Sequence, residues 1–136
     1  MDSPATTAEP AAVAVVDDDP VVRRLMRFWL EHEGYAVREF ARGADALADA
    51  ELPHLVCLDL GLEDMPGLHV LEHYLAQDAD LPVVVVTAER TIETAVSAMR
   101  GGAYDFVTKP LDRQRVLLAV ARAAERRRLT ERVRGL

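Results

Sequence analysis

Cysteine is nearly absent from this sequence, and long apolar runs are missing. The single cysteine, Cys57, excludes a disulfide framework and a cysteine-based zinc site within one chain. Because Cys57 lies within an apolar run, we expect an inert buried thiol. No apolar stretch approaches the roughly 18–20 residues of a membrane span, so no membrane partner is expected. Residues 1–12 contain no lysine or arginine and do not resemble a secretory signal, so we expect a cytoplasmic protein.

The glycine-rich motifs that bind nucleotides are also absent. Neither G-x-x-x-x-G-K-[ST] nor G-x-G-x-x-G occurs, so nucleotide binding has no support. Acidic residues outnumber basic ones by 23 to 16, a balance that disfavours direct binding to nucleic acid. The charge is uneven, however, because residues 113–136 hold eight arginines and two acidic residues. This asymmetry indicates an acidic module with a basic extension.

A length of 136 residues indicates one domain with a tail. Residues 1–11 are rich in serine, proline, alanine and threonine and are predicted to be a disordered lead-in. Residues 12–125 form the predicted domain, and residues 126–136 extend its last helix. No aromatic residue accompanies the arginines at 126–128, so we interpret them as a solvated helix face rather than a nucleic-acid arm. One coiled-coil heptad follows, formed by Leu129, Val133 and Leu136.

Short β-branched runs alternate with amphipathic stretches along the chain. Strands are predicted at residues 13–17, 35–40, 54–59, 81–87 and 104–108, and helices at 21–33, 44–51, 66–77, 92–100 and from Asp112 to near the C-terminus. Asp19 before Pro20, and Thr91, are the predicted N-caps of two helices. Continuous apolar strands separated by helices indicate an α/β, doubly wound parallel sheet with helices on both faces. The apolar side of helix 21–33 is predicted to contain Val21, Val22, Leu25, Met26, Phe28, Trp29 and Leu30.

Polar side chains stand where the predicted strands end. Asp17, Asp18 and Asp19 end the first strand, Asp59 the third and Thr87 the fourth, and Lys109 follows the fifth. In an open parallel sheet, ligands bind outside the carboxyl ends of the strands, so these side chains are expected at one edge.

Clustered carboxylates repel one another and need a cation. Oxygen ligands select a hard metal, and Mg²⁺ suits a site that keeps waters for a phosphate. The three charges of Asp17, Asp18 and Asp59 would be balanced by Mg²⁺ and Lys109. A carboxylate can attack phosphorus to form an aspartyl phosphate, while the metal, a lysine and a hydroxyl neutralise the phosphoryl oxygens.

These residues resemble the receiver domain of bacterial two-component response regulators. The resemblance covers about residues 11–125 and rests on the Asp-Asp pair after the first strand, Asp59 with Gly67 eight residues on, Thr87-Ala88 and Lys109-Pro110. It implies a flavodoxin-like fold with strand order 2-1-3-4-5. It also implies a phosphorylation-controlled switch, not a turnover enzyme, with a sensor histidine kinase as partner.

The resemblance assigns roles to individual residues. Asp59 is the implied phosphoacceptor, Asp18 and Asp59 bind Mg²⁺ with the Gly61 carbonyl, and Asp17 assists through water. Thr87 and Lys109 contact the phosphoryl group, and Phe106 occupies the aromatic switch position. Ordering of Thr87 and Phe106 is expected to change the face formed by the fourth helix, fifth strand and fifth helix. Glu63 stands where the family usually has proline, and Pro66 replaces a polar residue, so the loop after Asp59 is expected to differ in shape.

The segment Thr91–Pro110 is similar to receivers that precede AAA+ ATPase modules in activators of alternative sigma-factor polymerase. That likeness implies a linker helix at residues 126–136, an output domain absent from this chain that would contact DNA, and a homodimer. The dimer would form through the fourth and fifth helices and the C-terminal extension. A stand-alone receiver, which relays phosphoryl groups or regulates a partner protein, is the alternative.

Two enzyme classes compete with this interpretation. His69, Glu72 and His73 match the H-x-x-E-H zinc peptidase motif. On a helical wheel these three face solvent, opposite an apolar side made by Leu68, Leu71, Tyr74 and Leu75, and no third ligand is evident. A phosphatase with an aspartyl-phosphate intermediate would need an acid two residues after Asp59, where Gly61 stands.

Overall fold

Five parallel strands form one sheet in a computed structural model that describes residues 10–135. The strand order is β2-β1-β3-β4-β5, which confirms the predicted fold. Of the predicted lead-in, residues 1–9 lie outside the described residues, and so does Leu136 of the predicted heptad. The elements are β1 (Ala12–Val16), α1 (Pro20–His32), β2 (Ala36–Phe40), α2 (Gly43–Ala48), β3 (Leu55–Leu58), α3 (Gly67–Gln77), β4 (Val83–Thr87), α4 (Ile92–Arg100), β5 (Asp105–Thr108) and α5 (Arg113–Arg134).

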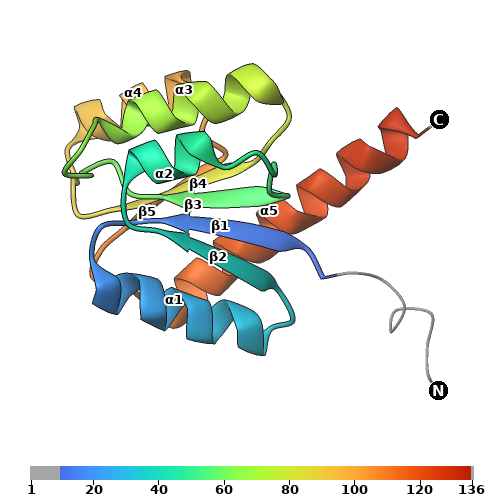
Figure 1. Cartoon of the computed structure of the whole chain (residues 1–136), viewed down its shortest axis with the longest axis horizontal. Coiled ribbons are helices and arrows are strands. Elements are labelled where there is room, and N and C mark those ends of the chain that lie inside the picture. Colours follow the sequence, from blue (N-terminus) through green and yellow to red (C-terminus); the bar gives the residue numbers. More distant parts are fainter. Residues whose placement is uncertain (1–9, 136) are drawn as a thin grey trace.

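Helices cover both faces of the sheet. Figure 1 shows α2, α3 and α4 on one side and α1 and α5 on the other. Successive residues of β1 accordingly enter different cores: Ala14 and Val16 face the three-helix side, and Val13 and Val15 face the two-helix side. Burial on both faces explains why the central strands are continuous apolar runs rather than alternating patterns.

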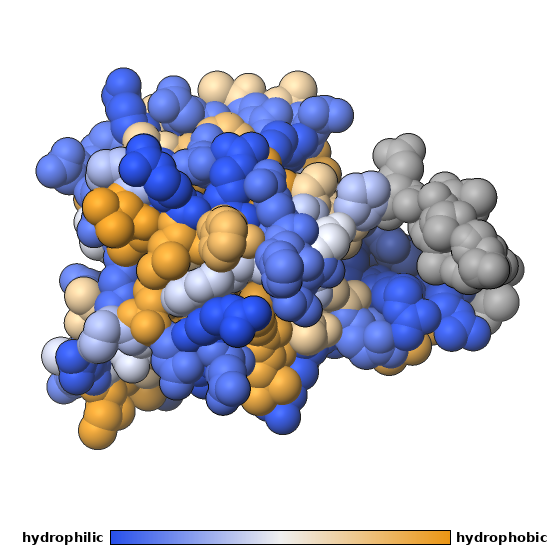
Figure 2. Space-filling view, turned by 90° about the horizontal axis from the view of Figure 1, so that it is seen from below, coloured by the Kyte–Doolittle hydropathy of each residue, from blue (hydrophilic) through white to orange (hydrophobic). Residues whose placement is uncertain are grey.

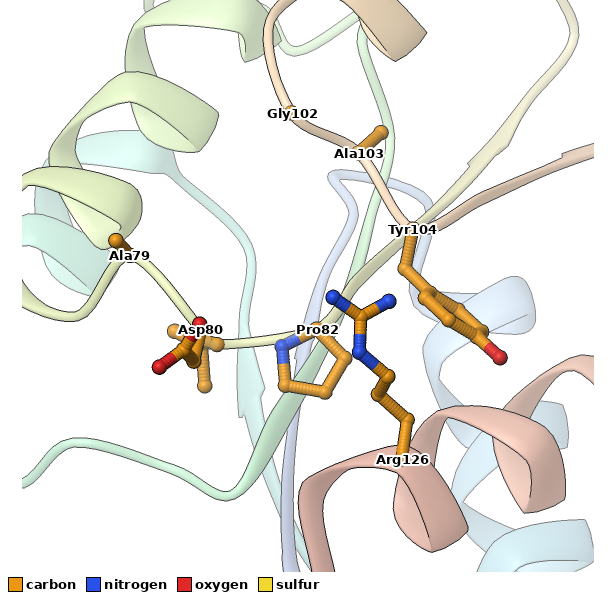
Figure 3. Close-up of a pocket in the computed structure, with 8 residues that line it drawn as sticks. Ala79, Asp80, Pro82, Gly102, Ala103, Tyr104 and Arg126 are labelled. Atoms are coloured by element: carbon orange, nitrogen blue, oxygen red, sulfur yellow. The ribbon is translucent and has the colours of Figure 1, made fainter. Parts of the chain in front are cut away.

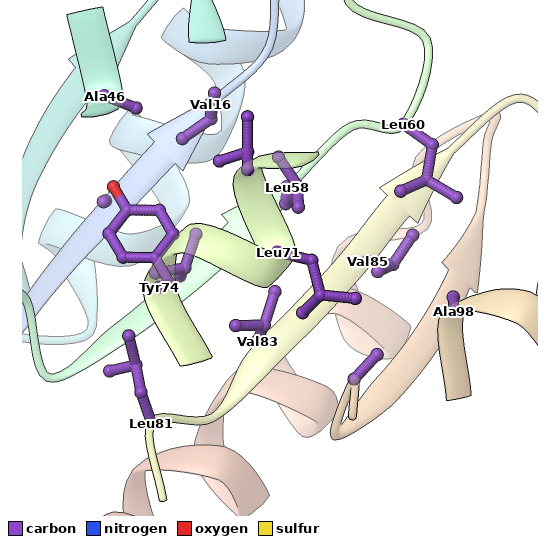
Figure 4. Close-up of a cluster of buried hydrophobic side chains, with 14 of the residues drawn as sticks. Val16, Ala46, Leu58, Leu60, Leu71, Tyr74, Leu81, Val83, Val85 and Ala98 are labelled. Carbon is purple, nitrogen blue, oxygen red and sulfur yellow. The ribbon is translucent and has the colours of Figure 1, made fainter. Parts of the chain in front are cut away.

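Branched and aromatic side chains fill the core beneath α3 and α4. Leu71 and Tyr74 of α3 pack over Leu58 and Val83 of the sheet, and Ala98 completes the cluster from α4 (Figure 4). Each fully buried leucine or valine stabilises the fold by about 1.5–3 kcal/mol.

The opposite core contains Cys57, which is 2% exposed. It packs with Met26 and Leu30 of α1 and with Val116 and Val120 of α5. Burial raises the pKa of the Cys57 thiol to about 12, so the thiolate is not formed near neutral pH. The cysteine is therefore the inert buried thiol that the sequence predicts.

Two helices begin at the side-chain N-caps that the sequence predicts. Asp19 accepts a hydrogen bond from the Val21 amide at 2.9 Å and caps α1. Thr91 accepts one from the Thr94 amide at 3.1 Å and caps α4. These bonds satisfy amides that have no partner within the helix.

The predicted apolar side of α1 is too wide. Met26 and Leu30 are buried, but Val21 and Phe28 remain 67% and 69% exposed, and Leu25 is also exposed. A helix lying on a sheet buries a stripe of its surface rather than half of it. Apolar patches therefore interrupt the hydrophilic surface on this side of the molecule (Figure 2).

The last helix, α5, continues past the end of the sheet (Figure 1). Its 22 residues span about 33 Å at 1.5 Å per residue. Within residues 10–135, none of the helices combines the length and apolarity that crossing a membrane requires.

The arginines of this extension are not the uniformly solvated face that the sequence suggested. Arg127 is only 9% exposed, and its Nη1 lies 2.7 Å from Asp78 Oδ2 at the end of α3. Arg134 contacts Asp78 at 2.7 Å and Asp80 at 2.8 Å. We call these four residues the α5 clamp. Asp78 and Asp80 are about fifty residues away in sequence, so helical periodicity alone does not reveal the pairing.

A pocket of about 230 Å³ lies beside the clamp. The Arg126 side chain extends from α5 toward Tyr104 and Pro82 there (Figure 3). Its guanidinium carbon lies 5.4 Å from the centre of the Tyr104 ring, a cation–π distance. The residues that immediately precede β4 and β5 thus lie against α5, at the end of the sheet where these two strands begin.

Candidate functional site

Adjacent strands bring two predicted site aspartates together. Val16 of β1 is in register with Leu58 of β3, so Asp17 and Asp59 leave the sheet side by side. Asp18 joins them, and one carboxylate oxygen from each residue lies within 4.8 Å of the others. Among residues 10–135, this is the one group of three or more such side chains placed to hold a metal ion. All the ligand atoms are oxygens, which suits a hard divalent cation.

Lys109 connects two of these carboxylates across the edge of the sheet. Its Nζ lies 2.8 Å from Asp17 Oδ2 and 3.3 Å from Asp59 Oδ2. Burial lowers the pKa of Lys109, but the hydrogen bond and charge of Asp17 and the charge of Asp59 outweigh it, so the pKa is raised. The lysine is therefore a fixed positive charge at neutral pH.

Asp17 is 2% exposed, and its burial has a cost. Burial raises the pKa of Asp17 more than the hydrogen bonds from Lys109 and the Asp19 amide lower it. The charge of Asp59 raises it further. The single positive charge of Lys109 therefore offsets only part of the negative charge of the three carboxylates. A bound cation would reduce the repulsion that remains between them.

Short turns orient the two carboxylates. Asp17 Oδ1 accepts from the Asp19 amide at 2.9 Å, and Asp59 Oδ1 accepts from the Gly61 amide at 3.1 Å. In both turns the aspartate side chain accepts a hydrogen bond from the backbone amide two residues further on. Arg23 supports the first turn, because its Nη1 donates to the Asp17 carbonyl at 2.7 Å. Sequence analysis missed Arg23, since a side chain that bonds to a backbone carbonyl leaves no spacing signal.

The eight-residue spacing from Asp59 to Gly67 has a steric cause. A Cβ on Gly67 would lie 2.5 Å from the Asp59 carbonyl oxygen and 2.4 Å from Leu60 Cα. Only glycine lets α3 begin this close to the backbone of the candidate phosphoacceptor. The Gly67 amide also donates to the Leu60 carbonyl at 3.0 Å.

Thr87 ends β4 at the same edge and is fully buried. Its hydroxyl accepts a hydrogen bond from the Glu89 amide at 3.3 Å. The Thr87 carbonyl accepts from the Lys109 amide at 2.8 Å, which fixes the residue after β5 beside β4.

Phe106, on β5, packs half-buried against the core beneath α3 and α4. Arg115 of α5 holds the backbone here, donating to the Phe106 carbonyl at 3.1 Å and pairing with both oxygens of Asp105. Sequence analysis missed Arg115 as well. This contact ties the predicted switch position to α5.

The H-x-x-E-H motif is not assembled into a metal site in the described part of the chain. His69 and Glu72 are exposed, and His73 Nε2 lies 2.8 Å from Gln77 Nε2. No additional ligand joins the three within residues 10–135. Leu71 and Tyr74 are buried as the helical wheel predicts, whereas Leu68 is 36% exposed because it lies at the rim of the contact.

A parallel sheet of this order, with an acidic edge closed by a lysine, defines a receiver-type α/β domain. Residues 13–121 match the family model of the response regulator receiver domain. The chain therefore belongs to that family, as its sequence motifs predicted.

Curated relatives are regulatory proteins. The C4-dicarboxylate transport transcriptional regulatory protein DctD of Rhizobium meliloti is 39% identical over 127 residues, which cover 92% of this chain and 28% of DctD. The nitrogen assimilation regulatory protein NtrX of Azorhizobium caulinodans is 40% identical over 129 residues, which cover 91% of this chain and 28% of NtrX. The chain thus spans less than a third of these relatives.

Solved structures agree with the fold. The signal receiver domain of a putative Luxo repressor protein from Vibrio parahaemolyticus superposes with a TM-score of 0.87 at 30% identity, covering 93% of this chain and 99% of that one. NtrX from Brucella abortus, solved with ATP, gives 0.84 at 39% identity, covering 90% of this chain and 29% of that one.

Proposed function

We propose that this receiver domain accepts a phosphoryl group on Asp59 from a sensor histidine kinase, with Mg²⁺ as cofactor. The observation that carries the proposal is the group of Asp17, Asp18 and Asp59 with Lys109 bonded to two of them. Asp18, Asp59 and the Gly61 carbonyl would hold the metal, and Asp17 would act through water. The bound ion would supply positive charge to the phosphoryl oxygens.

The chain's own groups have defined tasks in this transfer. An Asp59 carboxylate oxygen attacks phosphorus and forms the acyl phosphate as the bond to the donor breaks. Lys109 is already charged and lies close to Asp59, so its ammonium group can pair with a phosphoryl oxygen once the phosphoryl group is on Asp59. The Thr87 hydroxyl accepts from Glu89, which leaves its proton available to donate. The domain thus promotes its own phosphorylation and dephosphorylation and acts as a switch, not a turnover enzyme.

The output would pass through the face made by α4, β5 and α5. Ile92, Val96 and Met99 form an exposed apolar stripe along α4, and Leu118 is exposed on α5. Ordering of Thr87 and Phe106 around the phosphoryl group would change this face and favour a homodimer. Residues 12–125 would be the receiver and residues 126–136 a linker helix.

The protein would regulate transcription in the cytoplasm through an output domain outside this chain, such as an AAA+ module. That part of the proposal is supported by DctD, a transcriptional regulatory protein more than three times longer than the region that this chain matches. A stand-alone receiver that relays phosphoryl groups is the alternative. The reading frame that follows Leu136 distinguishes the two.

Phosphorylation with a small acyl-phosphate donor tests the chemistry. We expect one phosphate per chain in wild type with Mg²⁺, and none in Asp59→Asn or after chelation of the metal, as measured by intact mass. Asp45→Asn, which changes an exposed acidic residue of α2, should incorporate phosphate normally. Equal incorporation in wild type and Asp59→Asn would remove Asp59 as the acceptor.

A further inference from the structure

The loop between β3 and α3, residues 59–66, is fastened to the start of α2. Asp64 Oδ1 accepts a hydrogen bond from the Gly43 amide and Oδ2 one from the Ala44 amide, both at 2.9 Å. Both carboxylate oxygens are therefore used by one helix start. The bonds from Ala44 and Gly43 lower the pKa of Asp64, so the carboxylate is ionised at neutral pH.

Met65, the residue after Asp64, strengthens this attachment because it packs closely against Gly43. A Cβ on Gly43 would lie 2.6 Å from Met65 Cγ and 2.7 Å from its sulfur, so a larger residue at 43 would displace Met65. Met65 in turn packs against the core beneath α3. Gly43 and Asp64 therefore both contribute to the contact between this loop and the start of α2.

The helix depends on this contact as much as the loop does. Helix α2 has only six residues, and Arg42, at its N-cap, makes no side-chain capping bond. Asp64 supplies the missing acceptor from a distant part of the chain. Short helices are marginal without such tertiary support.

The same loop carries the group expected to complete the metal site. Gly61 lies three residues before Asp64, and its amide already bonds to the Asp59 carboxylate. Glu63 stands where the family usually has proline, so the fixed backbone angle of proline is absent at position 63. At its far end the loop is fixed by the contact between Gly67 and Leu60.

We infer that Asp64 is a positioning residue for the metal and phosphoryl site: it holds the loop so that the Gly61 carbonyl is presented beside Asp18 and Asp59. This inference rests on the proposed function. Both Asp64 oxygens bond to the start of α2 and would not ligate the metal or the phosphoryl group, so replacing Asp64 should change the affinity for Mg²⁺ rather than the maximal rate.

The test measures the half-saturating Mg²⁺ concentration, both by direct metal titration of the unphosphorylated chain and from phosphorylation by a small acyl-phosphate donor. In the full chain, Asp64→Ala should raise it about tenfold, the lower range for losing an outer-shell contact of a metal site. The rate at saturating Mg²⁺ should stay close to wild type. Asp64→Asn retains one acceptor oxygen and should give an intermediate value. Glu63→Ala removes the same charge from an exposed neighbour in the same loop and should leave the value unchanged.

Three results would overturn the inference. The first is a half-saturating Mg²⁺ concentration in Asp64→Ala equal to wild type. The second is an equal rise in Glu63→Ala, which would assign the effect to overall charge. The third is a reduced rate at every Mg²⁺ concentration together with a lower melting temperature, which would assign it to stability alone. Absence of Mg²⁺-dependent phosphorylation in wild type would instead contradict the proposed function.

Discussion

The consecutive aspartates after β1 have different tasks. Asp17 is buried against Lys109, Asp18 belongs to the group of three carboxylates that could hold a metal ion, and Asp19 caps α1. We therefore expect Asp18→Ala to lose Mg²⁺ binding with little change in stability. Asp19→Ala should keep Mg²⁺ binding and lose about 1 kcal/mol of unfolding free energy, the usual value of an N-cap. Metal titration and urea unfolding measure the two effects, and the reverse pattern would contradict the assignment.

The sequence predicts which functional residues lie at the strand ends, but it does not predict the side chains that hold their backbone in place. Asp17, Asp59 and Thr87 follow strands whose carboxyl ends share an edge, so alternation of strands and helices sufficed to group them. Arg23 and Asp64 act on backbone groups of other segments. Their partners are set by tertiary packing, which no local pattern encodes.

At the scale of elements, periodicity and caps placed every strand and helix to within a few residues. The boundaries of α4 were predicted correctly because Thr91 caps it and Gly101 follows it. Helix α2 ends at Ala48, three residues before the predicted end. The α5 clamp went unpredicted, because an arginine-rich helix surface gives no indication of which arginine meets an aspartate from another helix.

The stability that the α5 clamp gives to the fold depends on pH. The hydrogen bonds from Arg134, together with the one from Arg127, outweigh burial and lower the pKa of Asp78 well below its usual range. A lowered pKa in the folded state stabilises the protein above the unfolded value of about 3.9, and this stabilisation is lost as pH falls toward the folded value.

We therefore expect Asp78→Asn to lower the unfolding free energy by about 1–2 kcal/mol at pH 7, between the values of exposed and buried pairs. Below a pH of about 4 its difference from wild type should shrink. Denaturant unfolding at several pH values measures this. Asp80→Asn, which loses only an exposed contact with Arg134, should be milder. A difference between wild type and Asp78→Asn that does not change with pH would contradict the role of the clamp.

At the scale of the whole molecule, we expect the C-terminal part of α5 to pack against a second copy of the chain. Leu129 and Val133 are 48% and 69% exposed on turns that the sheet does not cover. We expect a weak homodimer that strengthens with a phosphoryl mimic and that Leu129→Glu abolishes. Phe28→Glu, on α1, should have no effect. Light scattering across concentration measures this, and a strictly monomeric chain at high concentration with the mimic would favour a stand-alone receiver.

One helix joins the two ends of the molecule. Helix α3 begins at Gly67, against the backbone of Asp59, and ends beside Asp78 in the α5 clamp. Its 11 residues form a rod of about 16 Å with no loop inside it. A displacement of its first turn would therefore reach Arg127 as movement of a rigid body. The part of α5 that leaves the domain is thus connected to the acidic edge by a series of direct contacts that does not pass through α4 or β5.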